Sequence, residues 1–156
     1  MMNKAYIGIG TNLGNRELNI IRACEEMNRC GITVLRQSSI ENTKPVLYEN
    51  QPDFLNTVVY VSAECSANEL LVKLKGIEVK LGRVPSVEKG PRLIDLDILL
   101  YNNTVVECPD LVLPHPGIRE RIFVLKHLLE LNPDLSDPRD GVAYIEVYNE
   151  KKKHYC

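Results

Sequence analysis

Hydrophobic and polar residues alternate along several short stretches of the chain, as they do in strands with one buried face. The first stretch is Ala5–Ile9, and Gly10 interrupts it. The longest alternation runs through Leu55–Ala63, and apolar residues also dominate Ile32–Leu35 and Ile94–Tyr101. The pattern therefore predicts four strands.

Between these strands, apolar residues recur at the three- and four-residue spacing of one helical face. The first helix is expected to begin after Asn15, a residue type that caps helices, and to stop at Gly31. The second begins at Ser66-Ala67-Asn68-Glu69, a capping box in which a hydroxyl and a carboxylate each accept a bond from a free backbone amide. A third helix is predicted from Gly117 to Leu131.

The predicted order is strand, helix, strand, strand, helix, strand, helix. It contains the split βαββαβ arrangement called ferredoxin-like, within the α+β class. We therefore expect a mainly antiparallel sheet with helices packed on it, mainly on one face. Weak alternation in Val142–Tyr148 predicts one more strand at a sheet edge, and Lys151–Lys153 is expected to be a solvated end. No repeat or linker divides the 156 residues, so a single domain over 1–156 is expected.

Two connections between predicted elements are long. One runs from Ser39 to Pro52 and the other from Arg83 to Leu93. Long connections in a compact domain are usually functional or disordered. Both adjoin the acidic motif described below, so they are expected to be active-site loops.

Charge and composition narrow the class of protein. A net charge of -2 gives no general attraction to nucleic acid or to anionic membranes. Five cysteines without the close pairing of zinc sites favour reduced thiols, and no apolar run is long enough for a signal peptide or membrane span. A cytoplasmic location is therefore expected. The sequence lacks a Walker A loop, a G-x-S-x-G elbow and an H-E-x-x-H motif, which excludes P-loop kinases and hydrolases of those types.

The strongest chemical motif is a pair of carboxylates on the fourth predicted strand. Asp95 and Asp97 are two positions apart, so they project from one strand face with alpha carbons roughly 6–7 Å apart. Neighbouring carboxylates repel each other unless a cation lies between them, and magnesium prefers carboxylate and phosphate oxygens. Two such ions roughly 3.5–4 Å apart could share these ligands. A bare D-x-D is more often a solvated polar face, but the preceding Gly90-Pro91-Arg92 and the apolar strand favour a metal site.

Cationic residues are concentrated in sequence around this strand. A triphosphate needs several donors, and arginine offers planar, bidentate ones. The candidates are Arg83, Arg92, His115, Arg119 and Arg121. Any one of them alone could be a surface charge, and that is the favoured interpretation for Arg119.

A third motif suits a flat heterocycle, which needs an aromatic face and an amide that pairs with its edge. Phe54 and Asn56 share one face of the third predicted strand, and Phe123 on the third helix could cover the opposite side. These are the only two phenylalanines of the chain, although each taken alone could equally be a core residue.

Together these motifs resemble those of the 6-hydroxymethyl-7,8-dihydropterin pyrophosphokinases. The hallmark of that family matches Gly90–Leu99, read as Gly-Pro-Arg-x-x-Asp-x-Asp followed by apolar residues. Four further segments match in the family's order: Ala5–Gly14, Gln51–Asn56, Ile77–Arg83, and Pro114–Pro116 with Arg121–Leu125. The resemblance covers residues from about 4 to 135. Lys89 departs from it, because many members carry an aromatic residue there.

The resemblance implies roles for individual residues. It implies that Asp95 and Asp97 hold two Mg²⁺ ions that bridge ATP and the pterin hydroxyl. It implies phosphate-binding roles for Arg83, Arg92, His115 and Arg121. It implies a pterin pocket of Thr43, Val46, Phe54, Asn56 and Phe123, and ATP-binding positions at Leu71, Ile98 and Val112. Glu78 matches a family acid without a clear role.

The reaction that the resemblance implies is pyrophosphoryl transfer from ATP to the pterin alcohol in folate biosynthesis. The expected enzyme is a monomer whose substrates are ATP and the pterin, with no nucleic-acid or membrane partner; the sequence singles out no general base. Two alternatives stay open. One is a non-catalytic ferredoxin-like module that binds nucleotide or RNA. The other is a different two-metal phosphoryl-transfer enzyme or a nuclease.

Overall fold

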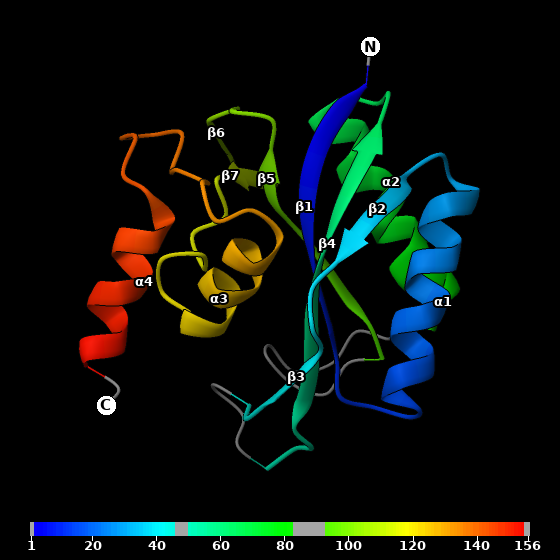
Figure 1. Cartoon of the computed structure of the whole chain (residues 1–156). Coiled ribbons are helices and arrows are strands. Elements are labelled where there is room, and N and C mark those ends of the chain that lie inside the picture. The colour runs from blue at the N-terminus through cyan, green and yellow to red at the C-terminus, as the bar shows by residue number, and fades with distance from the viewer. Residues whose placement is uncertain (1, 46–49, 83–92, 155–156) are drawn as a thin grey trace.

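The central element is an antiparallel sheet (Figure 1), seen in a computed structural model that describes residues 2–45, 50–82 and 93–154. Its strands lie in the order β2-β4-β1-β5, and β3 also pairs with β4. The strands are β1 (Asn3–Thr11), β2 (Thr33–Gln37), β3 (Glu41–Thr43), β4 (Phe54–Ala63) and β5 (Asp95–Tyr101). With the short β3 set aside, this is the order of a ferredoxin-like βαββαβ core, so the predicted fold class is confirmed.

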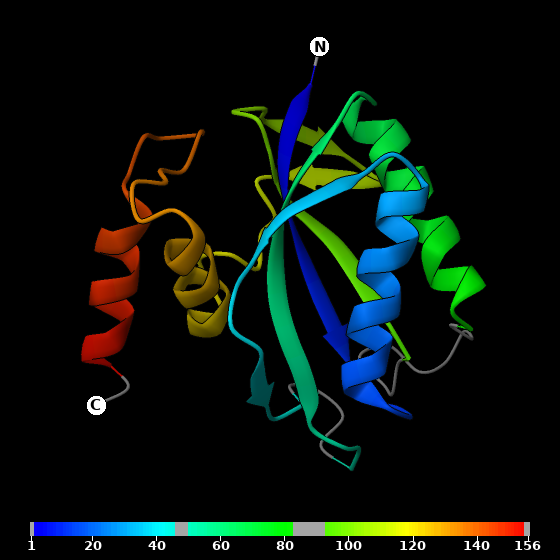
Figure 2. The same cartoon turned by 45° about the vertical axis from the view of Figure 1, so that its right-hand side comes forward.

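Two helices cover one face of the sheet. They are α1 (Arg16–Arg29) and α2 (Ala67–Lys80), which Figures 1 and 2 show side by side against the strands. Ile7, Ile9 and Val59 point toward them and are almost fully buried in the larger apolar core. The local signals behave as predicted: the Asn15 side chain accepts the Leu18 amide, and the capping box at the start of α2 is present.

The other face of the sheet carries α3 (Ile122–Leu131), with α4 (Tyr144–Lys153) packed on the outer side of α3. The prediction of helices mainly on one face is therefore wrong. Tyr6 and Val58 are the reason, because they project from this face and form a second apolar core with helical residues such as Leu125 and Leu128.

Further elements differ from the prediction, including β3, which lies within the connection expected from Ser39 to Pro52. Val142–Tyr148 is not an edge strand, because most of it forms α4, whose Tyr144 and Val147 pack on α3 at helical spacing. Lys151–Lys153 form the last turn of that helix, where positive charge is favourable. The third helix begins at Ile122, and the residues from Gly117 form turns that lead into it. Two short strands, β6 (Val106–Cys108) and β7 (Leu111–Leu113), form an unpredicted hairpin.

Within the described ranges, no helix combines the length and the apolar character that a membrane span requires.

Candidate active site

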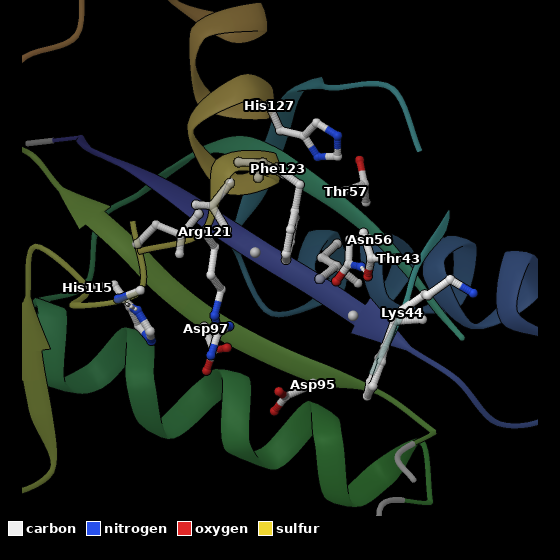
Figure 3. A pocket seen from close by; sticks show the side chains of 18 residues that line it. Thr43, Lys44, Asn56, Thr57, Asp95, Asp97, His115, Arg121, Phe123 and His127 are labelled. Carbon is white, nitrogen blue, oxygen red and sulfur yellow. Dashed lines mark hydrogen bonds between the residues drawn. The ribbon is translucent and has the colours of Figure 1, made fainter. Parts of the chain in front are cut away.

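A cleft opens where β1, β4 and β5 face the start of α3 (Figure 3). It contains about 880 Å³ of space, part of which is open to solvent. The predicted site residues that line it are Thr43, Phe54, Asn56, Asp95, Asp97, His115, Arg121 and Phe123. Residues that are distant in the sequence are thus gathered in one place.

The register of the sheet explains how the amide residue Asn56 and the carboxylate residue Asp95 are placed relative to each other. Gly10 of β1 pairs with Asn56 on one side and with Asp95 on the other. Gly8 is likewise flanked by Val58 and Asp97. Because neighbouring strands are about 4.8 Å apart, the alpha carbons of Asn56 and Asp95 are separated by roughly 10 Å, with only glycine between them.

The two glycines leave the floor of the cleft without side chains. A Cβ atom at Gly10 would lie 3.2 Å from the Asn56 amide oxygen, and one at Gly8 would lie 3.6 Å from Leu99. Ile7 and Ile9 alternate with these glycines and point into the opposite core. On one face, the side chains of β1 pack in the larger core. On the other face, its backbone at the two glycines is not covered by their own side chains, which leaves space for a flat ligand.

Asp95 and Asp97 lie at the start of β5 and are partly exposed, whereas Ile94 and Leu96 are fully buried. This is the alternation that the sequence predicts. Glu78 of α2, itself only 2% exposed, accepts the Leu96 backbone amide at 2.7 Å. The amide between the two aspartates is thereby held by a buried carboxylate.

The heterocycle motif forms a slot with two walls. Thr43 and Phe54 are paired across β3 and β4, and the Asn56 amide nitrogen donates to the Thr43 hydroxyl. Phe123 approaches from α3 on the other side (Figure 3). The predicted aromatic and amide groups thus face one cavity.

Two of the predicted cations also line the cleft. The His115 Nδ1 atom accepts the Gly117 backbone amide at 2.9 Å, so the neutral ring carries its proton on Nε2. Arg121 is the residue that caps α3. Arg119, for which a surface charge was the favoured interpretation, does not line the cleft; it is partly exposed and bonds Asp137 at 3.2 Å and Asp140 at 2.8 Å.

Six predicted residues are not placed in this cleft. Arg83, Arg92 and Val46, like the departure at Lys89, lie outside the described residues. The proposed ATP-binding positions are elsewhere: Leu71 packs against the larger core, Ile98 is buried in it, and Val112 is exposed on β7. The roles of all six stay predictions.

Both long connections are fixed where they enter the described structure. The Asn12 amide donates to Gln51 at 2.8 Å and to the Pro52 carbonyl at 2.9 Å, at the end of the first connection. At the end of the second, the Leu93 carbonyl accepts the Thr11 hydroxyl and the Asn19 amide. The segment from the end of β1 to the first turns of α1 therefore bonds the last residues of both connections.

His127 is a cleft residue that the sequence did not predict. It lies one helical turn after Phe123, and its Nε2 atom is 2.9 Å from the Glu41 carboxylate. Burial lowers the pKa of His127 below its ordinary value, although Glu41 opposes this effect. The four-residue spacing places His127 on the same helical face as Phe123, but it does not by itself identify a site residue.

The donor set of the cleft fits magnesium. Asp95 and Asp97 supply two carboxylates from adjacent positions on one strand face, and magnesium usually combines one or two carboxylates with phosphate oxygens and water. The described part of the chain has no cluster of three or more histidine, cysteine or acidic residues that could hold a metal.

Comparison with known proteins identifies one protein family. A family described as 7,8-dihydro-6-hydroxymethylpterin-pyrophosphokinase (HPPK) matches residues 6–133. The 2-amino-4-hydroxy-6-hydroxymethyldihydropteridine pyrophosphokinase of Bacillus subtilis is 43% identical over 132 residues, which cover 84% of this chain and 79% of that protein. The folic acid synthesis protein fol1 of Pneumocystis carinii is 44% identical over 146 residues, covering 94% of this chain. The chain spans only about a fifth of that fungal protein and of its Schizosaccharomyces pombe counterpart.

Solved structures agree on the fold. An HPPK-DHPS protein in complex with substrates superposes with a TM-score of 0.77 at 16% identity, covering 99% of this chain and 44% of that one. Plasmodium falciparum HPPK-DHPS with pteroate gives 0.79 at 15% identity, with coverage of 99% and 44%. The family match over residues 6–133 and the close bacterial relative lead to one conclusion: this chain belongs to the 7,8-dihydro-6-hydroxymethylpterin-pyrophosphokinase family.

Proposed function

We propose that this chain transfers the pyrophosphoryl group of ATP to 6-hydroxymethyl-7,8-dihydropterin, giving the pterin diphosphate and AMP in folate biosynthesis. The observation that carries the proposal is the row Asn56–Gly10–Asp95. A heterocycle paired with Asn56 would lie across the glycine floor and direct its hydroxymethyl group toward the carboxylates. Family membership supports a pterin as that heterocycle.

In the proposed reaction, the hydroxymethyl oxygen attacks the β-phosphorus of ATP. A bond from that oxygen to phosphorus forms, the bond from the β-phosphorus to the oxygen bridging to the α-phosphate breaks, and AMP leaves as the hydroxyl proton is lost. Asp95 and Asp97 would hold two magnesium ions, which supply neutralisation of charge on the phosphate oxygens when bound. We assign no general base.

The remaining groups act by positioning and by compensating charge. Phe54 and Phe123 hold the ring between them, and Asn56 fixes its edge. The proposed phosphate donors are His115 and Arg121 in the cleft, together with Arg83 and Arg92. The proposed working unit is a monomer.

A product assay tests the proposal. Purified protein is incubated with ATP, magnesium and 6-hydroxymethyl-7,8-dihydropterin, and nucleotides and pterins are separated by chromatography. The expected result is equal formation of AMP and pterin diphosphate, dependent on the pterin. Nucleotide hydrolysis without a pterin product would support a different two-metal enzyme, and ATP binding without turnover would support a non-catalytic module.

A further inference from the structure

His127 and Glu41 connect the two walls of the heterocycle slot. On one side, His127 follows Phe123 by one turn of α3, and the two rings meet edge to face with centroids 6.4 Å apart and an interplanar angle of 68°. Figure 3 shows the imidazole beyond Phe123, at the same end of the cleft as Thr57. A displacement of His127 would therefore act on the ring that covers the heterocycle.

On the other side, Glu41 belongs to the wall that carries the amide. In the β3–β4 ladder, Glu41 is opposite Asn56 and Thr43 is opposite Phe54. Directly opposite residues project from the same face of a ladder, so Glu41 shares its face with the three residues proposed to bind the heterocycle. A bond that fixes the Glu41 side chain therefore also fixes β3 beside the slot.

The bond between the two walls is well defined. The His127 Nε2 atom lies 2.9 Å from the Glu41 carboxylate, and the His127 side chain is 1% exposed. Because a carboxylate only accepts, the neutral imidazole donates from Nε2. Its Nδ1 atom is buried without a hydrogen-bond partner in the described structure, so a second proton there would have no acceptor.

Other bonds join the chain just before β3 to the end of α3. Ser39 donates twice to Glu130, at 2.7 and 2.9 Å, and Arg36 donates to the Leu131 carbonyl. These contacts fix the C-terminal end of α3. Lys126 also reaches Glu41, at 3.4 Å, but its side chain is half exposed and such pairs contribute little. Among these bonds, the His127–Glu41 bond has the more deeply buried donor, and it comes from the residue one helical turn after Phe123.

We propose that His127 is a positioning residue for the heterocycle, which through Glu41 fixes the separation between Phe123 and the Asn56 wall before substrate arrives. The role rests on the proposed pterin substrate. Without the bond, β3 and the start of α3 must be ordered by the ligand, and this ordering reduces affinity. The phosphate side of the cleft is built from β5 and the His115 turn, so ATP affinity should not depend on the bond.

The test measures binding of 6-hydroxymethylpterin by calorimetry, with the full chain saturated with magnesium and a non-hydrolysable ATP analogue. His127→Leu is expected to raise the pterin Kd about tenfold and to change the Kd of the ATP analogue less than twofold. His127→Gln, whose amide can still donate to Glu41, should stay within about threefold of the parent. In steady-state kinetics the His127→Leu change should appear in the KM for the pterin, with little change in kcat.

Two further variants complete the design. His154→Leu is the matched control. His154 is exposed at the end of α4, not on α3, and lies 3.8 Å from Glu150. This variant should bind the pterin as the parent does. Glu41→Ala removes the other partner from a partly exposed position, so it applies the same test if His127→Leu does not fold. It should reproduce the pterin defect.

The outcomes are distinct. Parent-like pterin affinity in both His127→Leu and Glu41→Ala would overturn the positioning role. So would equal losses in His127→Leu and His127→Gln, or an equal loss of ATP affinity, because either result would indicate general packing. A parent protein that binds the ATP analogue but not the pterin would instead overturn the proposed function, and the inference with it.

Discussion

The carboxylate of Glu78 accepts the backbone N–H of Leu96 at 2.7 Å, so α2 holds β5 at the single residue that separates Asp95 from Asp97. β5 lies at the edge of the sheet, and in the described part of the chain no strand lies on its outer side to bond this amide. A buried acid thus completes the strand at the point where its two carboxylates must be aligned.

Glu78→Ala is expected to leave the buried Leu96 amide without this acceptor, at a cost of about 1–3 kcal/mol in the free energy of unfolding. If the bond also aligns the aspartates, the variant needs more magnesium for half-maximal activity. Urea unfolding and magnesium titration of the initial rate check the two effects. Lys75→Ala is the control, since Lys75 contacts the same carboxylate at 3.5 Å from a half-exposed position. An unchanged magnesium requirement in Glu78→Ala would argue against the alignment role.

Asp95→Asn and Asp97→Asn are each expected to lower kcat/KM by a factor on the order of 10³ or more, because each removes a charged ligand from the proposed magnesium site. Manganese binding, followed by electron paramagnetic resonance in the presence of the ATP analogue, should weaken in both. Arg119→Ala is the comparison variant: its partners are Asp137 and Asp140, away from the cleft, so activity should be retained. Equal small losses in all three variants would contradict the assigned metal site.

Acid should destabilise the protein partly through Asp137. Its side chain is fully buried, and hydrogen bonds from Arg139 and Arg119 lower the pKa of Asp137 to about 2. A carboxylate whose pKa is depressed in the folded state contributes stability above its unfolded pKa of about 3.9, and this contribution is lost as the pH falls toward 2. The contribution is about 2 kcal/mol. Urea unfolding between pH 5 and pH 2.5 should show this loss, and Asp137→Asn should flatten that part of the curve; an unaltered pH dependence in the variant would contradict it.

Tyr144→Phe is expected to leave stability unchanged or to raise it by up to about 1 kcal/mol. The Tyr144 ring is fully buried in the core between α3 and α4, and its hydroxyl has no hydrogen-bond partner within the described structure. Removing a buried group that makes no hydrogen bond eliminates a desolvation cost. Thermal unfolding measures the change, and Tyr144→Ala, which leaves a cavity, should cost about 3–5 kcal/mol. A loss above 1 kcal/mol in the phenylalanine variant would show that the hydroxyl has a stabilising partner.

Local sequence signals predicted much of the fold because they act over a few residues. The capping box Ser66–Glu69, the Asn15 cap and the alternation around Asp95 and Asp97 are each complete within one element. The same kind of signal failed for Val142–Tyr148, where polar and apolar residues fit a period of two about as well as a helical one. The packing of Tyr144 against α3 favours the helix over the strand, and the sequence of the segment alone does not reveal that packing.

The candidate site was predictable to the extent that its residues carry recognisable chemistry. Asp95, Asp97, Asn56 and the two phenylalanines do so, and they meet in one cleft. His127 does not, because a histidine within an apolar helix is uninformative until its partner is known, and Glu41 is 86 residues away in the sequence. Glu78 is similar, since its bond to Leu96 depends on how α2 lies along β5.

The floor formed by Gly8 and Gly10 has a consequence for inhibitors of this chain. A compound stacked on that floor rests on main-chain atoms, which no point mutation can delete. Replacing either glycine would add atoms to the space in which the proposed flat substrate lies, and at Gly10 a Cβ atom would already lie 3.2 Å from the Asn56 amide oxygen. Drug resistance arising at these two positions would therefore come at the expense of substrate binding.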